Sequence, residues 1–79
     1  MPRKARAVLR RKMAQAWQHQ ARTVEIMIDM SELFKEAHPQ HAEFMQAVAQ
    51  NAYLTMDWIK DVSIQCWGFW PASIDSWLK

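Results

Sequence analysis

The chain has 79 residues and a mass of 9.4 kDa, a length that allows one small domain, residues 1–79, and excludes a second core. Apolar residues make up 51% of the sequence, charged residues 23%, and glycine occurs once, which is typical of a folded, helix-rich chain. The single cysteine excludes an internal disulfide, so we expect the cytoplasm or the interior of a viral particle. The longest uncharged runs are 13 residues each, too short for a membrane span, and we expect no signal peptide.

Charge is distributed unevenly along the chain. Residues 1–22 hold seven basic and no acidic side chains, whereas residues 23–79 hold three lysines and eight acids, a formal charge of −5. Such asymmetry indicates an anionic partner for the basic arm, whether nucleic acid, an acidic protein surface or anionic lipid, unless the arm only aids solubility. The candidate polyanion-binding residues are Arg3, Lys4, Arg6, Arg10, Arg11 and Lys12.

One long helix is predicted from about residue 4 to residue 37. This segment lacks glycine and internal proline and is rich in strong helix formers. His38 precedes Pro39 and is therefore disfavoured in the α region, which predicts the end of the helix. The apolar residues recur near the 3.5-residue spacing of packed helices. They form a predicted seam of Leu9, Met13, Ala16, Trp17, Val24, Met27 and Phe34.

A second helix is predicted over residues 39–67. Pro39 suits a first helical turn, and Gly68 is suited to the position just after a helix. The short turn between two long helices predicts an all-α, antiparallel two-helix hairpin. The predicted seam of this helix consists of Phe44, Val48, Ala52, Thr55, Trp58, Ile59, Val62 and Cys66.

Each helix carries a second apolar stripe that its partner helix cannot also cover. Ile26, Met30, Leu33 and Ala37 form this stripe on the first helix; Met45, Ala49, Ala52 and Met56, flanked by Tyr53, form it on the second. Exposed apolar surface usually marks an interaction site. We therefore expect self-pairing into a four-helix bundle or docking on another protein, with the alternative that the C-terminal tail covers one stripe. The candidate partner-binding residues in the helices are Ile26, Met30, Leu33, Met45, Tyr53 and Met56.

The tail, residues 68–79, is rich in tryptophan. Ser73 is a candidate cap for a short final turn that would present Ile74, Trp77 and Leu78 on one side. In one interpretation the tail is a lid over the open end of the hairpin. In the other, Trp70 and Trp77 are anchors that enter a groove on a partner. A membrane-interface role for the tryptophans is a weaker third interpretation.

No residue constellation indicates a reaction, and we predict no enzyme, metal or cofactor. Glu25, Asp29, Glu32 and Glu36 share one helix face and are interpreted as solvated. The pair His38 and His41 is interpreted as capping the turn, because a third metal ligand is missing nearby. Cys66 lies in the predicted seam and is interpreted as a small buried hydrophobe.

These observations favour a non-enzymatic helical interaction protein that assembles with itself or docks on a larger partner. A component of a viral or ribonucleoprotein assembly and a small phage-type inhibitor both fit this description. The alternative is a small, non-specific nucleic-acid-binding protein whose basic arm contacts phosphates. No helix-turn-helix pattern is present to aim side chains at base edges, so such binding would depend on charge.

Overall fold

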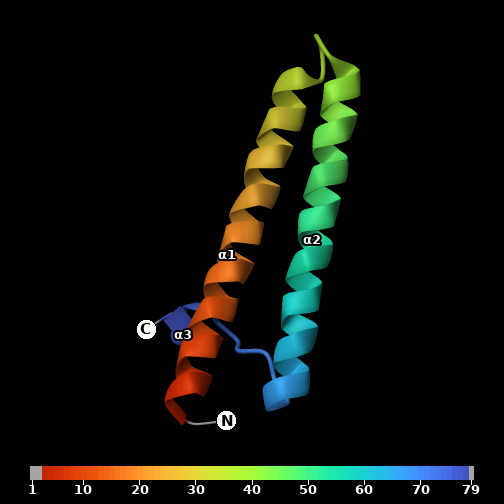
Figure 1. Ribbon diagram of the computed structural model, residues 1–79. Helices are drawn as coiled ribbons and strands as arrows, with labels where there is room; N and C mark the ends of the chain where they lie inside the picture. Colours follow the sequence, from red (N-terminus) through yellow and green to blue (C-terminus); the bar gives the residue numbers. More distant parts are fainter. Residues whose placement is uncertain (1–2, 79) are drawn as a thin grey trace.

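Two long helices and one helical turn make up the fold. In the computed structural model, which describes residues 3–78, α1 spans Arg3–Phe34, α2 spans Pro39–Trp67 and α3 spans Asp75–Leu78. α1 and α2 run antiparallel and side by side (Figure 1), and the molecule measures 53 × 22 × 19 Å along its principal axes. The predicted all-α hairpin is therefore confirmed, and no strand occurs in residues 3–78.

Proline and glycine position the helix ends. α1 ends three residues earlier than predicted, at Phe34, whose carbonyl accepts a 2.8 Å hydrogen bond from the His38 N–H across the turn. α2 begins at Pro39 and ends at Trp67, as predicted. Gly68 follows in the left-handed conformation with φ of 80°, where its N–H donates to the Ile64 carbonyl at 2.7 Å. Glycine suits this position because a Cβ disfavours positive φ.

Small side chains build the interface between α1 and α2. Alanine allows two helices to approach closely, since it leaves a shallow surface against which the neighbouring helix packs. Val24, Ala52 and Met56 form a buried cluster, against which Trp17 and Ala21 of α1 pack. The buried apolar residues of the two long helices are Ala14, Val24, Ala42, Ala49, Ala52 and Met56.

The second apolar stripe of α2, which was predicted to lie outside the hairpin interface, faces α1. Ala49, Ala52 and Met56 are buried and Met45 is half-buried, so the predicted surplus position of this stripe is wrong. Four of the eight predicted seam residues are instead exposed: Phe44 (63%), Trp58 (65%), Val62 (48%) and Cys66. Ala52, which belongs to both predicted stripes, is buried. The alanine-bearing side of α2 fits closely against α1, whereas the bulkier rings at positions 44 and 58 would hold the helices apart.

Two buried serines connect elements that lie apart in the sequence. The Ser31 hydroxyl of α1 donates to the Ala42 carbonyl of α2 at 3.1 Å, near the closed end of the hairpin. The Ser63 hydroxyl of α2 donates to the Phe69 carbonyl at 3.0 Å, at the start of the tail. Both hydroxyls are thereby satisfied inside the protein, where a polar group without a partner is costly.

Candidate interaction surface

The aromatic tail folds back onto α1. Trp77 is only 9% exposed, and its ring lies 5.5 Å from that of Trp67, 5.8 Å from Phe69 and 5.7 Å from Trp70, all in edge-to-face geometry. The Trp70 ring in turn lies 5.9 Å from Trp17 of α1. Edge-to-face contacts of this kind are favourable beyond the area they bury. The tail thus folds back onto the protein, as the lid interpretation expected, but it lies along the side of α1 beside residues 7–18. The outward position predicted for Trp77 is corrected.

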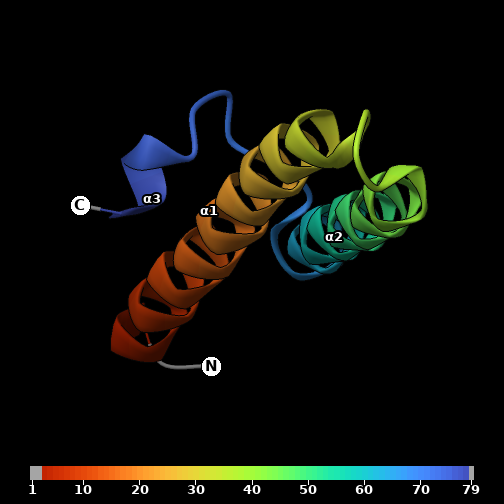
Figure 2. The ribbon, with the colours of Figure 1, turned by 90° about the horizontal axis from the view of Figure 1, so that it is seen from above.

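Polar contacts hold the tail in the same place. The Gln18 side-chain amide of α1 donates to the Asp75 carboxylate of α3 at 3.2 Å. The Trp77 N–H donates to the Ile74 carbonyl at 3.0 Å, so the predicted final turn is formed, with Ile74 and Leu78 half-buried beside Trp77. Figure 2 shows α3 beside α1, on the side away from α2.

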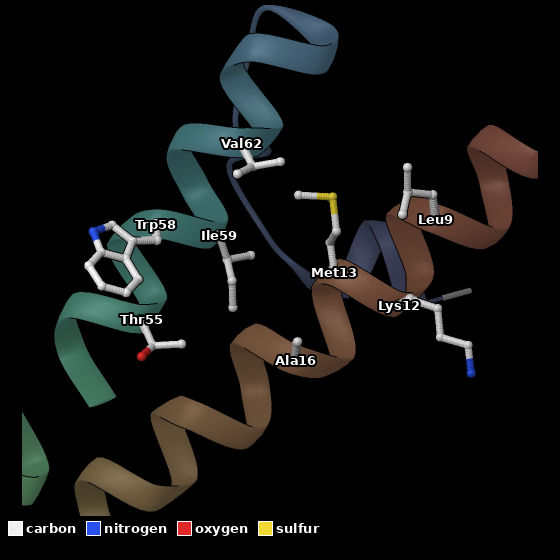
Figure 3. Close-up of a pocket in the computed structure, with 8 residues that line it drawn as sticks. All are labelled: Leu9, Lys12, Met13, Ala16, Thr55, Trp58, Ile59 and Val62. Atoms are coloured by element: carbon white, nitrogen blue, oxygen red, sulfur yellow. The ribbon is translucent and has the colours of Figure 1, made fainter. Parts of the chain in front are cut away.

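An apolar groove opens between α1 and α2 on the other side of the hairpin. Its volume is about 460 Å³, and none of the described tail residues, 68–78, lines it. Met13, Ile59 and Val62 point into the space between the helices, while Lys12 and Trp58 lie at its edges (Figure 3). A second open depression adjoins it and is lined by Lys4, Ala5, Val8, Leu9 and Lys12, of which the last two also line the groove. The groove is lined by Leu9, Lys12, Met13, Ala16, Thr55, Trp58, Ile59 and Val62.

Helical register continues this surface toward the closed end of the hairpin. Residues seven or fourteen apart lie on nearly the same side of an α-helix. Fourteen residues before Trp58 is Phe44, and seven before Thr55 is Val48. On α1, Ile26 lies fourteen residues after Lys12, Leu33 seven after Ile26, and Met30 fourteen after Ala16. We call this surface the uncovered face; it comprises the groove residues together with Ile26, Met30, Leu33, Phe44 and Val48.

The predicted partner-binding residues fall into three groups in the structure. Ile26, Leu33 and Tyr53 are exposed, Met30, Met45 and Trp70 are half-buried, and Met56 and Trp77 are buried. Tyr53 lies five positions before Trp58, which places it on a different side of α2 from the uncovered face. Sequence reasoning thus found part of this face but assigned Trp58 and Val62 to the hairpin interface, although both are exposed.

The candidate polyanion-binding residues of the basic arm lie in the first three turns of α1. Lys12 is the charged side chain that lines the groove, and Lys4 lines the adjoining depression. Along the described chain, Arg22 pairs with Glu25 at 3.0 Å within α1. Arg10 is half-buried, and the arm residues that are exposed to solvent are Arg3, Lys4, Arg6, Arg11 and Lys12.

The remaining polar candidates are spread over the surface. Glu25, Asp29 and Glu32 of α1 and Glu36 of the following turn are all exposed. At the bend, His38 makes no capping hydrogen bond with its side chain; its ring lies 5.2 Å from that of His41 and 6.2 Å from Phe34. Cys66 is exposed, so its predicted burial is wrong, because α2 turns the other stripe inward. Within residues 3–78 no three potential metal ligands lie together.

Comparison with known proteins finds no family, no curated protein and no solved structure that matches the chain. None of the helices described in residues 3–78 is long and apolar enough to cross a membrane. The candidate site therefore rests on the surface itself: an apolar groove and its continuation along both helices, next to a basic helix end.

Proposed function

We propose that this chain is a non-enzymatic helical interaction protein that binds another protein chain through its uncovered face, as a component of a larger assembly. The observation that carries the proposal is the exposure of Phe44, Trp58 and Val62 along one side of α2, beside the apolar groove. Large contiguous apolar surfaces on soluble proteins are typical of interaction sites. Tryptophan is also enriched among the interface residues that contribute most of the binding energy.

The different packing of the two aromatic regions supports this proposal. The tail rings pack against each other and against α1, so their contact area is already used within one chain. Trp58, by contrast, stands at the edge of the groove and is 65% exposed. A ring in that position offers apolar area to a partner without unfolding the protein.

The test compares two glutamate substitutions on α2. Trp58→Glu places a charge on the uncovered face, whereas Tyr53→Glu places the same charge at a similarly exposed position on another side of the helix. We expect Trp58→Glu to abolish complexes in sedimentation and in co-purification from the native cells, with the far-UV helix signal unchanged, because burying an unpaired charge at an interface is costly. Tyr53→Glu should leave the complexes intact. Equal behaviour of both variants would contradict the proposal.

Phosphate binding by the basic arm is a second candidate function. It is favoured by one observation: five exposed cations occupy the first three turns of α1 with no acid among them. Such binding would be insensitive to nucleic-acid sequence, and with about six phosphate contacts its affinity would fall about 10³-fold between ~50 and ~200 mM salt. Sequence-selective or salt-independent binding, measured by fluorescence anisotropy, would exclude this mode.

A further inference from the structure

We infer that the partner on the uncovered face is a second copy of this chain, packed antiparallel, so that α1 runs along α1 of the other copy and α2 along its α2. This inference rests on the proposed function and names the partner. The result would be a four-helix bundle with a twofold axis across the middle of the hairpin. Three features of the chain support this arrangement.

The exposed apolar stripe of α2 can pair with the same stripe of a second α2 that runs in the opposite direction. A twofold contact requires that residue i of one copy meet residue j of the other, and that j meet i. When α2 is reversed about Tyr53, Phe44 falls opposite Val62 and Val48 opposite Trp58. Each apolar residue of the stripe thus meets another apolar residue, and Asn51 meets Thr55 at the centre. Among these positions of α2, the reversal places no charged residue in the contact.

The charge on α1 changes sign along the helix. Residues 3–12 carry six cations and no acid, whereas residues 25–36, toward the other end of the hairpin, carry four acids and one cation, Lys35. Ala16 and Thr55 line the same groove, so the middle of α1 is level with the middle of α2. An antiparallel second copy therefore brings each basic segment beside the acidic segment of the other α1. The opposite arrangement would bring both basic segments together, and like-charge juxtaposition disfavours it.

The hairpin core is thin, and a second copy would complete it. The buried apolar residues of the two long helices are mostly alanines, and chains of this length commonly add core by association. Packing two uncovered faces together would cover Trp58, Val62 and Phe44 of both copies at once. A larger protein could cover the apolar groove, but it would not by itself account for the reversal of charge along the hairpin.

Two single-thiol variants test the arrangement. Cys66, which is exposed, is the only cysteine of the natural chain. The double substitution Cys66→Ser and Gln40→Cys moves the thiol to the other end of α2. Reversal about Tyr53 places position 40 of one copy opposite position 66 of the other. The two proteins are treated with a short bis-maleimide separately and then after mixing, and the products are weighed by mass spectrometry.

We expect crosslinked dimers in the mixture, containing one copy of each kind, at least tenfold more abundant than in either protein alone. Crosslinking of each protein with itself at the same yield would show that the open ends lie together, which overturns the antiparallel arrangement. A monomer in sedimentation, or a dimer without mixed crosslinks, also overturns it. Trp58→Glu should abolish the mixed crosslinks, and Tyr53→Glu should not.

The two proposals fail in distinguishable ways. If the purified chain is a monomer but Trp58→Glu still removes a complex with a different protein, the second-copy inference is wrong and the proposed function stands. If Trp58→Glu changes no complex of any kind, the uncovered face is not a binding surface and both are wrong.

Discussion

The two long sides of the hairpin differ in one respect: one is covered by the tail and the other is not. On the covered side, residues 69–78 lay Trp70 and Trp77 against α1 and add a hydrogen bond from Gln18. On the other side, the groove beside Trp58 and Val62 stays open. Both sides are apolar, so hydrophobicity alone does not distinguish an internal surface from an external one. The two sides differ because the tail reaches one of them and does not reach the other.

This difference assigns separate tasks to the tryptophans. Rings on the covered side contribute to the stability of one chain, because they are removed from water when that chain folds. The Trp58 ring on the uncovered side contributes to stability only when another chain binds over it. Substitutions on the covered side should therefore lower the stability of a single chain, and substitutions on the uncovered side should weaken its complexes.

The largest effect is expected from Trp77→Ala. Trp77 contacts three other rings and is buried, so its removal should lower the free energy of unfolding by about 3–5 kcal/mol. Urea denaturation at high dilution measures this loss. Trp77→Phe is the matched control and should lose less, since a ring remains in the cluster. A loss below about 1 kcal/mol for Trp77→Ala would show that the tail is not packed as described.

A smaller contrast is expected between two neighbouring positions of α2. Met56 is 9% exposed and faces α1, so Met56→Ala should cost about 2–4 kcal/mol. Trp58 is 65% exposed, and Trp58→Ala should change the stability of the dilute monomer by no more than about 0.5 kcal/mol. The same denaturation series measures both. The reverse order would mean that α2 packs through Phe44, Trp58 and Val62 after all.

The smallest effect concerns the hydrogen bond that joins α2 to the tail. Ser63→Ala removes the hydroxyl that donates to the Phe69 carbonyl at 3.0 Å, and we expect a loss of about 1 kcal/mol. Amide hydrogen exchange in residues 69–78 should rise before exchange in the long helices does. Ser76→Ala is the control, because its exposed hydroxyl donates to the Ser73 carbonyl within the same turn. Equal changes in the two variants would mean that the Ser63 bond does not hold the tail.

The helices could be predicted from the sequence because single residues determine their ends. Pro39 restricts His38, and Gly68 adopts the positive φ that stops α2, so both limits of α2 were predicted correctly. These are local effects, decided by the backbone of one or two residues. The end of α1 was predicted three residues too late, because no proline or glycine adjoins Phe34 to end the helix there.

The side that α2 turns inward could not be predicted from residue hydrophobicity. Phe44, Trp58 and Val62 are more apolar than Ala42, Ala49 and Ala52, and the larger residues were therefore assigned to the seam. The outcome depends on how closely two helices approach and on where the tail packs, and both are properties of the assembled fold. The bonds of Ser31 and Ser63 were missed for the same reason, because their acceptors are backbone carbonyls of other elements.

The contact between Gln18 and Asp75 joins residues that lie 57 positions apart in the chain. During synthesis at roughly 5–20 residues per second, α1 emerges from the ribosome several seconds before the segment that packs against it. α1 and α2 can pair as soon as both exist, since the turn between them is short. The beginning of α1, with Trp17, acquires its cover only after residues 69–77 have been made. α1 is thus synthesised before α2 but completes its packing after it.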